Sequence, residues 1–340
     1  MKQNKMKVFH GLVNYGTQAG VFAKELRRQG INAISVVNAD PLKRVVDINI
    51  RYDLNQKSII VRAFQRFWIK FSSFFKYNVF HFYYAKSLWP WNIDMPLYKL
   101  FGKKVVMEYL GTDIDLWLGY NGVDWRGRPV NRVKLVRRVY RQAKLVHKQL
   151  ACTPRYHEFV DNSIIVPLAL DLTDYSFHPL PSSLKEGEKV LTIMHAPTNR
   201  QGKKSDFIEA ALDRLKKEGY KFNYKCVTNV THAQLKEEYI KADIVVDQLN
   251  RWYGTVSVEA MALGRPVVCG FQTHLCSYDK RYKNLPIINA DIYNIYDVLK
   301  DILDDKYDLE AISKASRDFA MRVHDVRSVT KQLIDIYESL

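Results

Sequence analysis

Short apolar runs alternate with longer amphipathic stretches along most of the chain. Runs this short, uninterrupted by polar residues, are typical of strands buried on both faces of a parallel sheet. The predicted strands are 7–13, 33–37, 78–84, 103–109, 190–195, 224–227 and 244–247, with another beginning at Val267. Predicted helices separate them, so strand and helix alternate in two successive series. The sequence therefore predicts an α/β protein with two doubly wound units.

A polar stretch separates the two series. Residues 176–189 are mostly polar and contain Pro179 and Pro181, a composition typical of an interdomain linker. We therefore predict an N-terminal domain of residues 1–175 and a C-terminal domain that begins at residue 176. The regions 291–304 and 307–340 are predicted to be helical.

Residues 60–75 carry the clearest helical pattern in the chain. Arg62, Arg66 and Lys70 recur at intervals of four residues on one face. The opposite face holds Ile60, Phe64, Phe67, Trp68, Phe71, Phe74 and Phe75. Two interpretations stay open: a helix that packs on its own sheet, or an interfacial helix with aromatic rings among lipid headgroups.

Composition limits the class of protein. The 340 residues are 47% hydrophobic and 13% aromatic, which is typical of a globular chain. The sequence has neither an apolar stretch long enough to span a membrane nor an apolar signal region after Met1. Its four cysteines lack metal-binding or disulfide spacing. These features predict a cytoplasmic protein with reduced thiols.

Positive charge is concentrated in the first half. Residues 1–172 hold 28 Lys and Arg against 12 Asp and Glu, whereas residues 173–340 hold 24 of each. The whole net charge of +16 therefore lies in the first half. Within it, residues 126–148 contain nine Lys and Arg and no acid. We expect this half to bind an anionic partner such as a membrane surface, a lipid phosphate or a nucleic acid.

Two loops have the chemistry of an anion site. The loop after strand 190–195 carries Asn199, Arg200 and Lys203 ahead of a helix, where two cations can neutralise a diphosphate. Later, Gly254 and Thr255 begin a helix whose first backbone N–H groups can bind a phosphate or sugar oxygen. From chemistry alone, each loop could equally be an ordinary strand-to-helix connection.

The sequence motif around the second loop resembles that of a known protein family. Glu259-Ala-Met-Ala-x-Gly-x-Pro-Val-Val resembles the nucleotide-sugar signature of the family 4 retaining glycosyltransferases. The segments 78–113 and Pro-Thr-Asn-Arg-x-x-Lys at 197–203 are similar to that family as well. The resemblance implies the GT-B fold, in which two Rossmann-like domains face each other across a cleft. It also implies that the last helix, about 320–340, packs back on the N-terminal domain, which leaves 176–319 for the C-terminal domain.

The resemblance assigns roles to particular residues. Glu259 would accept hydrogen bonds from the nucleotide ribose, and Arg200 and Lys203 would bind the donor diphosphate and act in catalysis. The other donor-site residues would be Gly16, Asn199, Tyr253, Gly254 and Thr255. His81 and Asp113 would act beside the acceptor in the N-terminal domain. The family needs neither a cofactor nor a bound metal for catalysis. It also needs no dedicated protein base, because the departing phosphate oxygen is thought to take the acceptor proton.

The sequence departs from the family pattern at four places, one of which is Trp252-Tyr253-Gly254 where the family usually has Gly-Phe-Gly. Tyr83 stands where a second histidine is common, and Glu108-Tyr109 stands where a histidine often precedes Gly-Thr-Asp. Arg251 replaces the glutamate that the family usually carries eight positions before Glu259. Asp247, Gln248, Tyr253 or backbone amides near Gly254 would then have to contact the donor sugar, so the identity of that sugar cannot be carried over.

The sequence thus predicts a retaining hexosyltransferase that uses a nucleotide-sugar, UDP- or GDP-linked, as its donor. The acceptor would be a saccharide or a lipid-linked sugar in bacterial cell-surface polysaccharide, glycolipid or glycoconjugate synthesis. The basic half would hold the enzyme on the inner face of the cell membrane. One alternative is a GT-B nucleotide-sugar epimerase or hydrolase. Another is a basic nucleic-acid-binding protein, although the chain contains no nucleic-acid motif.

Overall fold

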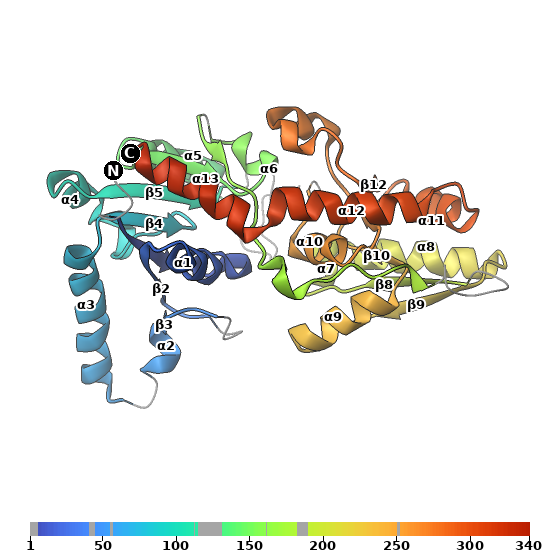
Figure 1. Ribbon diagram of the computed structural model, residues 1–340, viewed down its shortest axis with the longest axis horizontal. Helices are drawn as coiled ribbons and strands as arrows, with labels where there is room; N and C mark the ends of the chain where they lie inside the picture. The colour runs from blue at the N-terminus through green and yellow to red at the C-terminus, as the bar shows by residue number, and fades with distance from the viewer. Residues whose placement is uncertain are drawn as a thin grey trace. The chain divides into compact units, whose positions relative to one another are not determined.

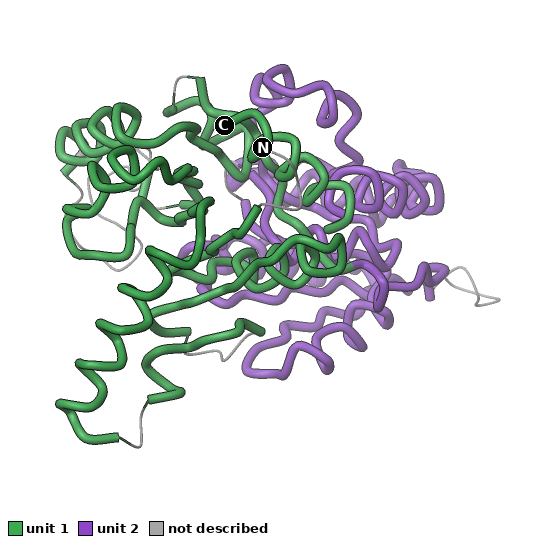
Figure 2. Tube along the Cα trace, turned by 60° about the vertical axis from the view of Figure 1, so that its left-hand side comes forward, with its two compact units in different colours: residues 1–171, 326–340 green, residues 172–325 purple. Residues whose placement is uncertain are grey.

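The computed structural model describes residues 6–40, 45–54, 57–111, 113–114, 131–160, 162–181, 190–249 and 252–340. They form two compact units (Figure 2). Unit 1 comprises residues 1–171 and 326–340, and unit 2 comprises residues 172–325. Arg251 and the basic positions 126 and 128 lie outside the described residues.

Unit 1 is built on one parallel sheet of seven strands. Their order is β3-β2-β1-β4-β5-β6-β7. The strands are β1 (Lys7–Leu12), β2 (Asn32–Val37), β3 (Ile48–Asn49), β4 (Val79–Tyr83), β5 (Lys104–Tyr109), β6 (Lys148–Ala151) and β7 (Ile164–Ile165). The central strand β4 is buried at every position, as expected for a parallel strand covered on both faces.

Helices cover both faces of this sheet (Figure 1). They are α1 (Gln18–Arg28), α2 (Ile50–Asp53), α3 (Ile59–Lys76), α4 (Met95–Leu100), α5 (Arg132–Ala143), α6 (Pro154–His157) and α13 (Val326–Glu338). Phe22 of α1 and Leu333 of α13 share one hydrophobic cluster. Phe74 of α3, Tyr98 of α4 and Val139 of α5 belong to a second cluster.

The chain leaves unit 1 and later returns to it. Unit 1 breaks off at Asp171 and resumes at Val326, whereas the sequence suggested a boundary at residue 175 and a returning helix from about 320. The backbone N–H of Val326 donates to the carbonyl of Leu170 at 2.9 Å. This bond holds the outgoing and the returning segments together within unit 1.

Helix α3 does not pack on its sheet along most of its length. Its side chain Phe74 is buried, but Ile60, Phe64 and Trp68 are 81%, 65% and 54% exposed. Figure 1 shows the helix projecting beyond the sheet of unit 1. The interpretation in which the whole aromatic face packs on the sheet is therefore wrong, because only the last turns of the helix reach the core.

Unit 2 repeats the architecture on a smaller scale. Its parallel sheet has the order β12-β11-β10-β8-β9. The strands are β8 (Leu191–His195), β9 (Phe222–Cys226), β10 (Ile244–Val246), β11 (Val267–Cys269) and β12 (Ile287–Asn289). The helices are α7 (Arg200–Lys203), α8 (Ser205–Lys217), α9 (His232–Lys241), α10 (Thr255–Ala262), α11 (Ile295–Leu303) and α12 (Leu309–His324). Two parallel sheets with flanking helices confirm the predicted α/β, doubly wound fold class.

Candidate functional site

The predicted donor residues of unit 2 gather where its strand order reverses. From β8, the chain continues to β9 on one side of the sheet and then to β10 on the other. The loops that follow β8 and β10 therefore diverge at the carboxyl edge of the sheet, which is where open α/β sheets bind ligands. The first loop leads to Lys203 and the second leads to Gly254.

Asn199 shapes the first loop. Its side-chain Oδ1 accepts a hydrogen bond from the N–H of Gly202 at 2.9 Å, which caps the short helix α7. A Cβ on Gly202 would lie 3.1 Å from the Asn199 side chain, so the tight turn favours glycine there. Lys204 then adopts a left-handed conformation with φ of 63°, which ends α7 and lets α8 begin at Ser205. Asn199 thus holds the loop, and Lys203 lies at its end.

Lys203 forms a buried ion pair with Asp247. Its Nζ lies 2.5 Å from Asp247 Oδ1 and 3.3 Å from the carbonyl oxygen of Ala196. Asp247 follows β10 and accepts a second bond, 2.6 Å long, from the hydroxyl of Ser257. Burial by itself would raise the pKa of Asp247, but the charge of Lys203 and the bonds from Lys203 and Ser257 lower it. Asp247 is therefore a carboxylate at neutral pH, and it pairs with an ammonium group.

The first turn of α10 lies beside this ion pair. Its N-cap residue, Gly254, has no side chain to cap the helix, unlike Thr231 at α9 or Asp308 at α12. A Cβ on Gly254 would lie 4.0 Å from Asp247 Oδ2. The uncapped N–H groups that begin at Thr255 thus lie beside the ion pair of Lys203 and Asp247, and uncapped N–H groups at a helix start can bind an anion.

Arg200 has different partners from Lys203. Its guanidinium pairs with the carboxylate of Glu209 on α8, with Nη1 3.1 Å from Oε1, and its Nη1 lies 3.8 Å from Cys226 Sγ. The side chain is 47% exposed. The structure therefore does not show the two predicted phosphate-binding cations on one common partner.

Glu259 lies one turn further along α10 and faces the start of α9. Its Oε1 is 3.1 Å from Nε2 of His232, the first residue of α9. The hydrogen bond to Glu259 raises the pKa of His232 above its usual value, even though partial burial opposes the shift. Only 11% of the Glu259 side chain is exposed, so its oxygens are confined to this corner of unit 2.

Two of the residues that could replace the missing glutamate already have partners inside unit 2. The buried Tyr253 places its hydroxyl 2.9 Å from His324 Nε2, and its ring contacts the rings of Trp252 and Phe319. Gln248 donates to the carbonyl of Trp252. The backbone N–H groups at the start of α10, by contrast, have no side-chain cap.

Sequence reasoning missed a buried histidine at the same edge. His195 ends β8, and its Nδ1 lies 2.8 Å from the carbonyl oxygen of Val246 in β10. Because a carbonyl only accepts, Nδ1 carries the proton, and Nε2 accepts from Ser205 Oγ at 2.8 Å. Burial lowers the pKa of His195, so this residue is a neutral bridge between two strands. A histidine at the last position of a strand was the only signal for it in the sequence.

In unit 1 the predicted residues lie on both sides of its own strand reversal, between β1 and β4. Gly16 occupies the turn after β1 with φ of 52°, a conformation that favours glycine. Asp113 follows β5 and is buried, with Oδ1 2.8 Å from the N–H of Gly111. Burial raises the pKa of Asp113 to about 6.

His81 is in the middle of β4 rather than at its end, because the strand continues to Tyr83. It is fully buried, with Nδ1 2.6 Å from the hydroxyl of Tyr337 in α13 and Nε2 2.9 Å from Glu108 Oε2. Burial lowers the pKa of His81 to about 3 and raises that of Glu108 to about 8. Both groups are therefore neutral at pH 7, and one hydrogen bond joins His81 to Glu108, which is one of the departures from the family pattern.

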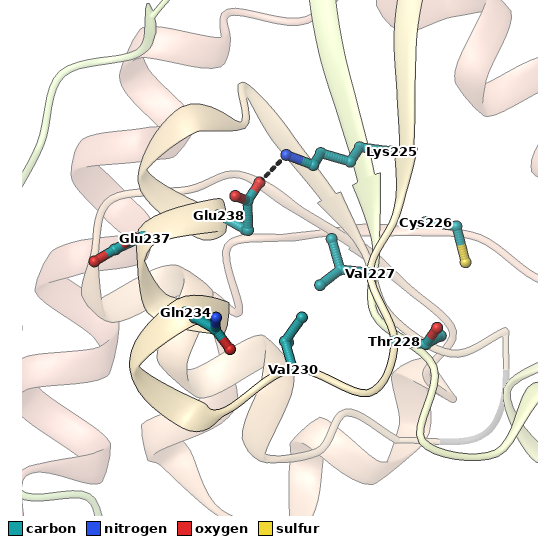
Figure 3. Close-up of a pocket in the computed structure, with 8 residues that line it drawn as sticks. All are labelled: Lys225, Cys226, Val227, Thr228, Val230, Gln234, Glu237 and Glu238. Atoms are coloured by element: carbon teal, nitrogen blue, oxygen red, sulfur yellow. Dashed lines mark ion pairs between the residues drawn. The ribbon is translucent and has the colours of Figure 1, made fainter.

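A separate pocket lies at the edge of unit 2. It has a volume of about 370 Å³ and is lined by β9, the loop after it and α9. Figure 3 shows the ammonium of Lys225 directed at Glu238, while the thiol of Cys226 points to the opposite side of the strand. None of the residues predicted for the donor site lines this pocket.

The described residues contain no group of three or more His, Cys, Asp or Glu arranged to hold a metal ion. The four cysteines are free thiols, of which Cys226 is exposed. Within the described part of the chain, no helix is both long and apolar enough to cross a bilayer.

No protein-family model matches the chain, and no curated protein sequence matches it either. Solved structures with the same fold do exist. One is a sucrose-phosphate synthase from Thermosynechococcus elongatus, with a TM-score of 0.63 and 14% identity over 98% of this chain and 99% of that one. Another is HepE from Anabaena in complex with UDP-glucose, with a TM-score of 0.63 and 11% identity over 98% and 100% of the two chains.

A third structure is a Listeria monocytogenes protein assigned as a UDP-N-acetylglucosamine 2-epimerase. Its TM-score is 0.56, with 12% identity over 98% of this chain and 96% of that one. At such identities the likeness establishes the fold, which is the GT-B fold of glycosyltransferases and related UDP-sugar enzymes.

Proposed function

We propose that the protein is a glycosyltransferase whose unit 2 binds a nucleotide-sugar donor. The observation that carries this proposal is the meeting of Lys203, Asp247 and the uncapped start of α10 at the strand reversal of unit 2. HepE, which has the same fold, was solved with UDP-glucose, and this supports a donor of the same class.

The diphosphate of the donor would lie between Lys203 and α10. An ammonium group has three donors, and the described contacts of Lys203 use two of them, on Asp247 and on Ala196. The third can reach a phosphate oxygen while Asp247 keeps the side chain in place. Arg200, which is half exposed, would exchange part of its bond to Glu209 for a phosphate oxygen.

Charge accumulates on the departing diphosphate as the sugar leaves. Fixed cations and helix N–H groups directed at that charge stabilise the transition state more than the ground state. Lys203 and Arg200 would supply this stabilisation without a bound metal. The transfer would retain the anomeric configuration, with the departing phosphate oxygen taking the proton of the acceptor hydroxyl.

Glu259 would bind the nucleotide ribose. A carboxylate offers several acceptor positions, which suits a vicinal diol. In the structure its Oε1 already accepts from an exposed imidazole, His232. A UDP- or GDP-linked sugar would replace or share that contact.

Unit 1 would present the acceptor, a saccharide or a lipid-linked sugar at an anionic membrane, for cell-surface polysaccharide or glycoconjugate synthesis. Gly16 would lie against the donor diphosphate, and Asp113 would contact the acceptor. His81 is fully buried and bonded to Glu108 and Tyr337, so its part would be to position the strand that carries the site.

A panel of UDP- and GDP-sugars tests the proposal. Thermal shift identifies the donor that binds, and release of nucleoside diphosphate shows that the glycosyl–phosphate bond is broken. A saccharide product bearing the donor sugar supports a transferase. A free sugar in which one ring stereocentre is inverted would instead identify an epimerase, the second candidate, which shares this fold. If no nucleotide-sugar shifts the melting temperature, the proposal is wrong.

A further inference from the structure

Unit 1 exposes an unusual amount of apolar surface on three segments that are distant in sequence. They are α3, residues 89–101 with helix α4, and α5, and together we call them the basic–aromatic face. Trp91 is 85% exposed and Leu100 is 77% exposed, in addition to Phe64 and Trp68 of α3. Side chains of this size are normally buried, so their clustering marks an interaction surface.

Direct contacts join the three segments. The rings of Phe67 and Trp89 lie 5.6 Å apart, and those of Phe74 and Phe101 lie 5.4 Å apart, which ties α3 to residues 89–101. Lys99 Nζ in turn donates to the carbonyl oxygen of Lys144, just past α5, at 2.6 Å. The face is therefore a single surface, and its apolar and basic parts are held together within unit 1.

The face carries no exposed acid. The sequence has no Asp or Glu between residues 54 and 93 or between 125 and 157. The only acid within 89–101 is Asp94, which is buried and bonded to Tyr98 and to the backbone of Leu88. Exposed cations line both helices, among them Arg66 of α3 and Lys134, Arg137 and Arg141 of α5.

We propose that the basic–aromatic face docks on an anionic lipid bilayer, with α3 lying in the plane of the interface. Aromatic rings favour the headgroup region, and cations on the polar side of such a helix are attracted to anionic lipids. A second copy of the chain fits poorly, because a symmetric contact would bring cations against cations. This inference deepens the proposed function by assigning the surface that holds the enzyme at a membrane acceptor.

The two parts of the face would act differently. The exposed aromatic side chains of α3 would enter the headgroup region, which buries apolar area and is insensitive to salt. The cations of α5 would attract the anionic surface over about 8 Å at physiological ionic strength, and this attraction weakens as salt is added. Salt should therefore lower the binding of the whole face only in part, whereas it should remove the contribution of α5.

Vesicle co-sedimentation tests both parts. Wild-type protein should sediment with vesicles of phosphatidylcholine and phosphatidylglycerol and bind vesicles of phosphatidylcholine alone much more weakly. Phe64→Ser/Trp68→Ser should weaken binding about tenfold or more at every salt concentration, because two exposed aromatic side chains no longer become buried. The matched control is Tyr278→Ser/Tyr293→Ser, two exposed aromatics of unit 2, which should bind as wild type does.

The charge variant is Lys134→Gln/Arg137→Gln, with Lys217→Gln/Lys283→Gln on unit 2 as its control. The first should weaken binding several-fold in low salt and not in high salt, whereas the control should match wild type. Quenching of wild-type tryptophan fluorescence by brominated lipids should also occur, and this measurement does not depend on how any variant folds.

Wild-type protein that stays in the supernatant with anionic vesicles at low salt would overturn the inference. The inference would also be overturned if the protein did not bind vesicles but self-associated, and if Phe64→Ser/Trp68→Ser abolished that self-association; the partner would then be a second copy. Binding to an acidic protein and not to vesicles would overturn it as well, and the acidic protein would be the partner. Diphosphate release from a soluble donor, measured in parallel, separates the two proposals. If release persists without vesicle binding, only the docking surface is wrong.

Discussion

Units 1 and 2 share one architecture and differ in where they place charge. Both are parallel sheets with a reversal of strand order near the middle. By composition, unit 1 holds 30 Lys and Arg against 14 Asp and Glu, whereas unit 2 holds 22 of each. Unit 1 carries its positive charge on exposed helices, and unit 2 carries a buried cation at the edge of its sheet.

The polar groups at the two strand reversals differ in kind as well. In unit 1, His10 of β1 lies beside His81 of β4. Both histidines and Glu108 are buried and are neutral at pH 7. In unit 2, the corresponding edge holds Lys203 and Asp247 as an ion pair. The topology therefore decides where a site can form, and the side chains at that edge decide whether it can bind an anion.

The largest expected effect comes from removing Lys203. Lys203→Ala leaves the buried Asp247 without its cation, and such a loss typically costs about 3–5 kcal/mol. Hydrogen exchange followed by mass spectrometry should show the loss in peptides of unit 2 and not in those of unit 1. Lys217→Ala, an exposed lysine of α8, serves as the control and should change neither unit.

The double variant Lys203→Ala/Asp247→Ala separates stability from function. It removes both charges, so it should recover most of the lost stability and still release no diphosphate from a bound donor. Recovery of activity along with stability would mean that Lys203 acts only in folding.

Glu259→Gln should weaken binding of the nucleoside diphosphate by about 1.5–3 kcal/mol, because an amide forms weaker bonds to the ribose than a carboxylate. Titration calorimetry with UDP and GDP measures the change. Glu310→Gln, an exposed acid in the first turn of α12, should bind like wild type. Unchanged affinity in Glu259→Gln would remove Glu259 from the donor site.

The neutral network of unit 1 predicts a dependence of stability on pH. Burial raises the pKa of Glu108 from 4.5 to about 8. The contribution of Glu108 to the stability of unit 1 is therefore complete below pH 4.5 and is lost as the pH rises to 8. His81, with its pKa lowered from 6.5 to about 3, contributes above pH 6.5 and loses that contribution as the pH falls to 3. The two trends cancel between pH 4.5 and 6.5.

Unit 1 should therefore lose about 2 kcal/mol of stability between pH 6.5 and 8, where only Glu108 changes. Glu108→Gln keeps a neutral hydrogen-bonding group and should abolish that loss. Hydrogen exchange of β4 and α13 peptides at several pH values measures it. A wild-type unit 1 whose stability stays constant over that interval would show that Glu108 is ionised in the folded protein.

The smallest expected effect on stability is that of Arg200→Ala. The pair between Arg200 and Glu209 is substantially exposed, so its loss should change the stability of unit 2 very little. Turnover should fall by about a hundredfold or more if the guanidinium moves to the diphosphate. A near wild-type rate at saturating donor would exclude Arg200 from the reaction.

Periodicity was sufficient to predict the architecture, since each strand predicted from an apolar run has a counterpart in the sheets. The run at 190–195 is β8, for example, and the run at 103–109 is β5. The strands β3, β6, β7 and β12 were not predicted, because runs of two to four residues give little pattern. Nor could the pattern show that α3 exposes its aromatic face, because a helix that packs on a sheet and one that meets a membrane carry the same amphipathic repeat.

The partners of the candidate residues were less predictable. The spacing of Asn199, Arg200 and Lys203 placed them in one loop, but it could not show that Lys203 turns toward Asp247 while Arg200 turns toward Glu209. Likewise, His81 was expected to act beside the acceptor, and its contact with Tyr337 joins residues 256 positions apart. Contacts of this kind depend on the tertiary fold, which a local pattern does not contain.

The return of the chain to unit 1 has a consequence for synthesis on the ribosome. Unit 2 is one uninterrupted segment, so it can fold as soon as residue 325 has emerged. Unit 1 has to wait for α13, whose Leu333 and Tyr337 fill the cluster that also holds Met6 and Val8. Until then, the N-terminal half, although made first, has an uncovered apolar face, and the downstream unit is the first to be complete. A nascent chain stalled just before α13 should therefore be protected from proteolysis in unit 2 and cleaved in unit 1.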